Sequence, residues 1–306
     1  MDYMTFVDHL LRCCGKGGAY AVAVQSRIRR QPEKAAGNAF ASALTDADLS
    51  IQNFFEVELL GAGYPIRFDP EEAERSLNIG YFPQDAEHTL LLDPVDGTKI
   101  YADCIPYFGI ACTLLCKSTV VAGVYYMPHE RRAYVMVEGL HGPRIINLRD
   151  PHQWLSLQLL PNGGQPLRFP RKSTIVVAWD QALDPAMMHR LREQCNTVAF
   201  TSYPGPNPKT WRYGVPSVLT GDAAAIVKPN AKLLDFGVAA WIVEHAGGCV
   251  SDFAGQPIPN YLDYPEQRIP GLVMSRDRAT HDHVISALHG EDKGDSHHGS
   301  DQSTHE

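Results

Sequence analysis

The stretch LLLDPVDGTKIY, residues 90–101, decides how this part of the chain folds. Its apolar start predicts a buried strand that ends at Asp93. Pro94 stiffens the turn that follows, and Asp96 comes within reach of the same point in space. Two carboxylates at one point suit Mg²⁺, which binds carboxylates, water and substrate phosphate oxygens.

Gly97 and Thr98 follow the two aspartates and predict the start of a helix. The free backbone N–H groups and the positive dipole end of a helix form a seat for phosphate. The stretch therefore joins a metal site to a phosphate site. The same pattern also describes a solvent-exposed turn or a structural calcium loop.

Composition narrows the class of protein. The chain has 306 residues, 44% of them hydrophobic and 20% charged, enough for one large domain or two packed halves. No apolar run approaches the roughly 18 to 20 residues that span a bilayer, and the N-terminal residues do not resemble a signal peptide. The sequence predicts a soluble, cytoplasmic protein. Its net charge of −8 argues against binding a nucleic-acid polymer.

Two further features concern cysteines and the C-terminal tail. The seven cysteines form no CxxC pair and have no histidines at zinc-finger spacing, so we expect reduced thiols that mostly fill the core. Residues 291–306 contain no hydrophobic residue and predict a disordered acidic tail. Metal capture by the tail histidines His297, His298 and His305 is the alternative.

Hydrophobic patterns predict a layered α/β or α+β sandwich. Apolar residues at helical spacing precede residue 63, and a Pro-, Gly- and Asn-rich stretch at 148–171 suggests a junction. We expect an N-terminal half, residues 1–147, and a C-terminal half, residues 148–290. Strands are predicted at HTLLLD (88–93), FGIACTLLC (108–116), VVAGVYYM (120–127), RAYVMVEG (132–139) and STIVVAW (173–179), and a helix at PAMMHRLREQC (185–195).

A second motif lies at LLDFGVAAWIVEHAGGCVSDFAG, residues 233–255. It places Asp235 at the head of an apolar helix that ends at Gly247 and Gly248. Simple N-capping by this aspartate is the alternative. Further carboxylates lie upstream, at Asp46, Asp48, Glu71 and Glu72.

In this order the motifs resemble the inositol monophosphatase superfamily of metal-dependent, typically lithium-sensitive phosphatases. The superfamily pattern Asp-Pro-hydrophobic-Asp-Gly-Thr is matched by residues 93–98 without exception. Its second pattern, Trp-Asp followed by an apolar helix ending in Ala-Gly-Gly, matches residues 235–248, with Leu234 in place of tryptophan. Thr45 to Asp48 match its Thr-x-Ala-Asp element, and Glu71 with Glu72 its Glu-Glu pair. The resemblance covers roughly residues 35–290.

The resemblance implies an alternating αβαβα sandwich, a homodimer and two or three Mg²⁺ ions. Glu71, Asp93 and the carbonyl of Val95 would bind one ion. Asp93, Asp96 and Asp235 would bind a second, and a third, weaker ion would lie near Glu71. The nucleophile would be a water activated by metal and oriented by Thr98 and Glu71, with Asp48 tuning Thr98 or the outer shell. Backbone N–H groups of Gly97 and Thr98 would bind the phosphoryl oxygens.

The sequence departs from the superfamily pattern at positions that bear on the choice of substrate. Lys99 is typical of the 3′(2′),5′-bisphosphate nucleotidase branch, but Ile100 stands where that branch commonly has Glu. Lys209 lies where the superfamily usually has Arg, and Lys228 where inositol-cleaving members tend to carry Glu. Both lysines, expected near the mouth of the site, favour an anionic or different leaving group, and the alternative is that they are solvated surface lysines.

Three functions stay open. The first is a Mg²⁺-dependent phosphatase acting on a small soluble phosphate monoester. The second is a 3′(2′),5′-bisphosphate nucleotidase or sugar bisphosphatase. The third is a non-catalytic regulatory protein that binds metal or phosphate. The intact carboxylate set argues against the third, because a chain with no need of metal could relieve the repulsion among clustered carboxylates.

Overall fold

A computed structural model describes residues 1–30, 43–148, 165–166, 173–206, 211–258 and 267–290. Lys209 and the predicted tail at 291–306 lie outside these described residues. In the described part of the chain, no helix combines the length and the apolar character needed to cross a bilayer.

The described residues form two sheets, the first of which has seven strands in chain order. Its β1 and β2 run parallel, and the other neighbours are antiparallel. The strands are β1 Ile66–Pro70, β2 His88–Asp96, β3 Gly109–Cys116, β4 Thr119–Met127, β5 Arg132–Val137, β6 Arg144–Asn147 and β7 Gln165–Pro166. Four of the predicted strands, at 88–93, 108–116, 120–127 and 132–139, are therefore confirmed as β2 to β5. The division into halves at residues 147 and 148 stays a prediction, and β7 beyond it pairs with β6.

The second sheet has five strands in the order β11-β12-β10-β8-β9. They are β8 Thr174–Val177, β9 Asn196–Ala199, β10 Ala225–Lys232, β11 Cys249–Ser251 and β12 Arg268–Ser275. The helices are α1 Tyr3–Val24, α3 Asp46–Ala62, α4 Thr98–Ala102, α5 Pro185–Gln194, α6 Ser217–Thr220, α7 Leu233–His245 and α8 Arg278–His289. The predicted strand at 173–179 and helix at 185–195 correspond to β8 and α5.

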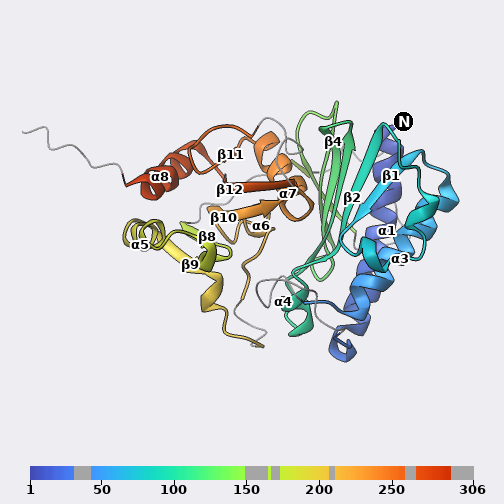
Figure 1. Cartoon of the computed structure of the whole chain (residues 1–306), viewed down its shortest axis with the longest axis horizontal. Coiled ribbons are helices and arrows are strands. Elements are labelled where there is room, and N and C mark those ends of the chain that lie inside the picture. Colours follow the sequence, from blue (N-terminus) through green and yellow to red (C-terminus); the bar gives the residue numbers. More distant parts are fainter. Residues whose placement is uncertain (31–42, 149–164, 167–172, 207–210, 259–266, 291–306) are drawn as a thin grey trace, which may run out of the picture.

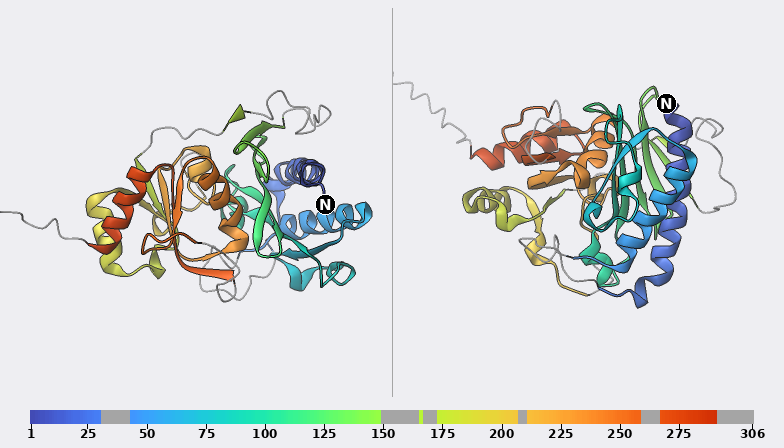
Figure 2. Two further views of the ribbon diagram at one scale, coloured as in Figure 1. Left: turned by 90° about the horizontal axis from the view of Figure 1, so that it is seen from above. Right: turned by 45° about the vertical axis from the view of Figure 1, so that its right-hand side comes forward.

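Alternating side chains of the strands face three of the four buried hydrophobic clusters formed by the described residues. On β3, Ile110 and Cys112 face a core shared with α1 and α3, whereas Ala111 faces a second core shared with α7. On β10, Ile226 faces that second core and Val227 a third, shared with α5 and α8. The order of layers is thus helices, sheet, helices, sheet, helices, as Figures 1 and 2 show. The expected αβαβα sandwich is confirmed.

Helix α7 lies between the two sheets and contacts strands of both. Val238, Ala239 and Ile242 are fully buried, as expected for a helix that is apolar on all sides. On β4, Gly123 allows the helix to approach closely, because a Cβ there would lie 2.4 Å from Cγ2 of Val238. The packing of α7 against the first sheet therefore requires glycine at this position.

Candidate metal centre

The motif strand β2 extends past Asp93 as far as Asp96, so the prediction that it ends at Asp93 is wrong. Asp93 pairs with Ala111 and Asp96 with Gly109, leaving two residues of β2 opposite one of β3. This irregularity is a β-bulge, which re-aims side chains without ending the strand. The carboxylate of Asp93 accepts a hydrogen bond from the N–H of Val95 at 3.0 Å, across the bulge.

Gly97 connects the bulge to α4 with a φ of +89°, in the left-handed region that favours glycine. Helix α4 begins at Thr98, as predicted, but has only five residues, so its dipole is short. The Thr98 hydroxyl lies 3.0 Å from Oδ1 of Asp48 and 2.9 Å from the carbonyl oxygen of Val95. Thr98 thus joins α3 to the motif strand.

Asp48 is held by a capping box at the start of α3. The backbone N–H and the hydroxyl of Thr45 both donate to its Oδ2, at 2.9 and 2.6 Å. Burial raises the pKa of Asp48 to about 7, and the charge of Glu71 adds to the shift. The predicted action of Asp48 on Thr98 is therefore consistent with the direct hydrogen bond between the two side chains.

Glu71 and Glu72 follow β1, and parallel pairing with β2 brings them to the same edge of the sheet as the motif. The N–H of Glu71 donates to the carbonyl of Leu92 at 2.9 Å. Gln52 clamps the backbone of Glu72, accepting from its N–H at 3.0 Å and donating to its carbonyl at 3.1 Å. Sequence reasoning missed Gln52, although it lies one turn beyond Asp48 on the same helix.

The side-chain oxygens of Asp48, Glu71 and Glu72 all lie within 4.8 Å of one another, close enough to share a cation. This set includes Glu72 and leaves out Asp93, so it differs from both ligand sets implied by the resemblance. Those two sets stay predictions.

Asp235 lies in the first turn of α7, but it does not cap the helix. The N-cap residue is Lys232, without a side-chain capping bond, so the N-capping alternative for Asp235 is wrong. Burial raises the pKa of Asp235 to about 6, and repulsion from Glu71 adds to it. The carboxylate therefore faces other acids.

Asp96 belongs to the same electrostatic group. Burial raises its pKa to about 7, a hydrogen bond from Tyr125 opposes the shift, and the charges of Asp235 and Glu71 increase it. The Tyr125 hydroxyl donates directly to Oδ2 of Asp96. The sequence analysis did not identify Tyr125. The only indication in the sequence was that Tyr125 belongs to the predicted strand at 120–127, which is β4 and lies next to β3.

Lys228 is not on the surface, so the interpretation as a solvated surface lysine is wrong. Its place near the substrate stays a prediction. Its side chain is buried, and Nζ lies 3.3 Å from the centre of the Trp179 ring. Nζ also donates to the carbonyl of Pro229 at 3.0 Å. Burial lowers the pKa of Lys228 to about 7, against the opposing charge of Asp235. Lys228 therefore faces the carboxylate cluster from the second sheet.

The donor set consists of carboxylate, hydroxyl and carbonyl oxygens, the ligands of a hard cation such as Mg²⁺. Burial and mutual repulsion raise the pKa values of three of its members, Asp48, Asp96 and Asp235. A bound divalent cation would remove that repulsion. The residues present thus fit a metal site of the kind expected.

Comparisons with known proteins agree with this fold. Residues 18–161 match the model of the inositol monophosphatase family. Nus factor SuhB of Pasteurella multocida is 26% identical over 175 residues, 56% of this chain and 59% of that protein. Fructose-1,6-bisphosphatase of Pyrococcus furiosus is 25% identical over 92 residues, 29% of this chain and 36% of that protein.

A solved structure of an IMPase from Thermotoga maritima superimposes with a TM-score of 0.69 at 18% identity, covering 95% of this chain and 98% of that one. Fold and site define a layered α/β protein with a buried cluster of acids at the edge of its larger sheet. The family match over residues 18–161 and the fold are those of the inositol monophosphatase superfamily. The alignments of the chain span 59% and 36% of the two curated relatives named above.

Proposed function

We propose that the chain is a Mg²⁺-dependent phosphatase that hydrolyses a small soluble phosphate monoester. The observation that carries the proposal is the acid cluster in which burial and repulsion from Glu71 raise the pKa values of Asp96 and Asp235. Perturbed carboxylates of this kind gather at functional sites, and cations relieve them. The family match supports the phosphatase class.

The chain's own residues would bind and orient the reactants. Glu71, Asp93 and the Val95 carbonyl would hold one Mg²⁺, and Asp93, Asp96 and Asp235 a second. When bound, the ions would supply positive charge that neutralises phosphoryl oxygens and acidifies water. An acidic protein could bind an anionic substrate in this way.

Thr98 would position the attacking water together with Glu71. When the Thr98 hydroxyl donates to Asp48, at 3.0 Å, its oxygen keeps lone pairs that can accept a hydrogen bond from water. Because Thr45 holds the other oxygen of Asp48, the position of the carboxylate that faces the Thr98 hydroxyl is fixed. Backbone N–H groups of Gly97 and Thr98 would bind the phosphoryl oxygens.

A phosphate-release panel tests the proposal. Inositol 1-phosphate, a 3′,5′-bisphosphorylated nucleotide and fructose 1,6-bisphosphate are each assayed with Mg²⁺ and after chelation. We expect Mg²⁺-dependent release from at least one of them. Absence of Mg²⁺-dependent release from any small phosphate ester would favour the non-catalytic function.

A bisphosphate nucleotidase or sugar bisphosphatase is the second candidate, because Lys228 brings a cation to the acid cluster. Lys209, outside the described residues, is proposed with it. The match to a fructose-1,6-bisphosphatase points the same way. A charge-assisted hydrogen bond of about 1 to 3 kcal/mol to a second phosphate would give a roughly 5- to 150-fold preference over a neutral polyol phosphate.

Lys228→Gln tests this candidate, since glutamine keeps a polar side chain at a buried position. The variant should lose kcat/KM selectively for the doubly phosphorylated substrate and keep it for inositol 1-phosphate. An equal loss on both would make Lys228 a structural residue. A cytoplasmic location and a homodimer are proposed from the superfamily, and light scattering after size-exclusion chromatography tests the dimer.

A further inference from the structure

A second group of metal-ligating side chains lies between α1 and α3, apart from the acid cluster. His9 and Cys13 are four residues apart on α1 and therefore share one face of that helix. Glu58 reaches them from α3, and the ligand atoms of all three residues lie within 4.8 Å of one another. The proposed phosphatase function uses none of these side chains.

The distances approach those of a tetrahedral zinc site. Bonds of about 2.0 to 2.3 Å place the ligand atoms of such a site about 3.3 to 3.7 Å apart. Nε2 of His9 lies 3.4 Å from Oε2 of Glu58. Nδ1 of His9 lies 3.3 Å from the hydroxyl of Tyr64, an outer partner of the kind that fixes the orientation of a metal-binding imidazole.

The titratable ligands would have to change state when a divalent cation binds. Burial lowers the pKa of His9, which keeps the imidazole neutral and able to bind metal. Burial raises the pKa of Cys13 to about 12, with the charge of Glu58 adding to it, so the thiol stays protonated until a cation replaces the proton. One thiolate and one carboxylate would then balance a divalent ion. The charged and titratable groups that face these residues are Arg12, Lys16, Glu58, Tyr64 and Cys112.

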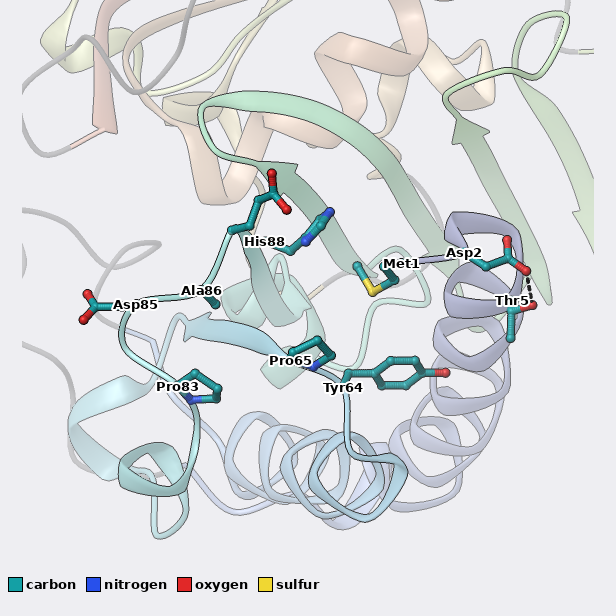
Figure 3. A pocket seen from close by; sticks show the side chains of 10 residues that line it. Met1, Asp2, Thr5, Tyr64, Pro65, Pro83, Asp85, Ala86 and His88 are labelled. Atoms are coloured by element: carbon teal, nitrogen blue, oxygen red, sulfur yellow. Dashed lines mark hydrogen bonds between the residues drawn. The ribbon is translucent and has the colours of Figure 1, made fainter.

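The location separates this group from the proposed Mg²⁺ site. Tyr64 precedes β1, whereas Glu71 follows it, and five residues of strand span about 16 Å. Tyr64 also lines a cavity of about 580 Å³, and Asp2, Asp85 and Glu87 are among its other lining residues. Figure 3 shows its ring directed from that cavity toward α1. Solvent and acidic side chains thus lie beside the partner of His9.

We propose that His9, Cys13 and Glu58 bind a divalent cation of the zinc type, with water as the fourth ligand. Glu58 is 34% exposed in its side chain and forms the open edge of the site. Lys16 lies 3.7 Å from its Oε1 and would give way to the ion. The bound ion would link α1 to α3, the two helices that cover the outer face of the larger sheet.

Cobalt titration of the chelator-treated full-length protein tests the site. A thiolate ligand gives Co²⁺ a near-ultraviolet charge-transfer absorption that the carboxylate cluster cannot produce. We expect this absorption to saturate at one ion per chain, to disappear on addition of Zn²⁺ and to persist in excess Mg²⁺. Cys13→Ser should abolish it, whereas Cys104→Ser, the same change at an exposed cysteine, should leave it intact.

A second variant keeps the test decisive if Cys13→Ser folds poorly. Glu58→Gln alters a partly exposed side chain and should weaken Co²⁺ binding more than 10-fold, since even outer partners of metal ligands cost about 10- to 100-fold. Zn²⁺ should also raise the Tm of the parent more than that of Glu58→Gln. Equal Co²⁺ affinity in the parent and Glu58→Gln, or a spectrum without thiolate absorption, would overturn the proposal.

Discussion

Two aspartates flank α4, and the protein treats them in opposite ways. Asp96, before the helix, has its pKa raised to about 7 by burial and by the charges of Asp235 and Glu71. Asp103, after it, is also buried, but hydrogen bonds from Lys99 and Tyr203 and the charges of Lys99 and Arg30 outweigh burial and lower its pKa. Burial alone does not decide the state of a carboxylate; the sign of its neighbours does.

This difference distinguishes Asp103, a carboxylate with a structural role, from Asp96, a carboxylate available to bind a cation. Asp103 accepts from Arg30 at 2.6 Å and from the Tyr203 hydroxyl at 2.7 Å, and Lys99 also bonds to it. Because Lys99 already pairs with Asp103, its presence alone does not indicate a bisphosphate substrate. At the acid cluster the balancing charge would come from bound metal.

The largest effect is expected from Asp93→Asn, which removes the proposed bridging ligand. Mg²⁺-dependent turnover should fall by more than about 100-fold, because even outer partners of metal ligands cost 10- to 100-fold. Circular dichroism should remain that of the parent. The matched control is Asp103→Asn, which should keep its kcat. Near-normal Mg²⁺-dependent activity in Asp93→Asn would refute the metal assignment.

Asp103→Asn should instead lower the free energy of unfolding at pH 7, by about 1 to 3 kcal/mol, because Lys99 and Arg30 lose their counter-charge. Since the folded-state pKa of Asp103 is lowered, its contribution is present above the unfolded value of about 3.9 and is lost as pH falls through the folded value. Urea denaturation should show the difference from the parent shrinking below about pH 4. An equal difference at pH 7 and pH 3 would assign the effect to packing.

Asp96→Asn should act in the opposite direction on the metal-free protein. Removing one charge from the cluster relieves repulsion, and asparagine still accepts from Tyr125, so stability after chelation at pH 8 should rise by about 1 to 2 kcal/mol. Added Mg²⁺ should raise the Tm of the parent more than that of the variant. A loss of stability in the metal-free variant would show that the cluster is not under electrostatic strain.

Deletion of residues 291–306 should have the smallest effect. It removes five acids and one lysine, about half of the net charge of −8, but no hydrophobic residue. If only neighbouring charges matter, activity and Tm should not change. A fall in either in a differential scanning or phosphate-release assay would show that the tail contacts the folded part.

The sequence was sufficient to predict the motif residues, most strands of the larger sheet and the layered class. Motif positions 93–98 and 235 carry their information locally, in residue types and spacing. The bulge between Asp93 and Asp96 depends on pairing with β3, which no local pattern specifies. For the same reason β2 was predicted to end too early.

Lys228 and Tyr125 could not be placed from sequence because their surroundings come from distant segments. Lysine is seldom fully buried, so exposure was the natural expectation. Its actual neighbour, the Trp179 ring, lies beyond the end of another strand of the second sheet. Four of the cysteines, at 13, 14, 112 and 249, do fill the core as predicted. Cys13 also meets His9 one helical turn away, a spacing unlike that of zinc fingers.

Because of the close contact at Gly123, the distance between α7 and the larger sheet determines how far apart the carboxylates of the acid cluster lie. Asp93 and Asp96 belong to the larger sheet, whereas Asp235 is carried by α7, and the helix rests against that sheet through Val238. Helix and sheet can lie this close together because Gly123 has only a hydrogen atom where other residues have a Cβ. The Cβ of an alanine there would lie 2.4 Å from Cγ2 of Val238, and any shift of the helix away from it would carry Asp235 along. Such a variant would change a residue of the core, but the assay would show an altered metal affinity. Residue 123 therefore offers a way to adjust the site without changing any of its ligands.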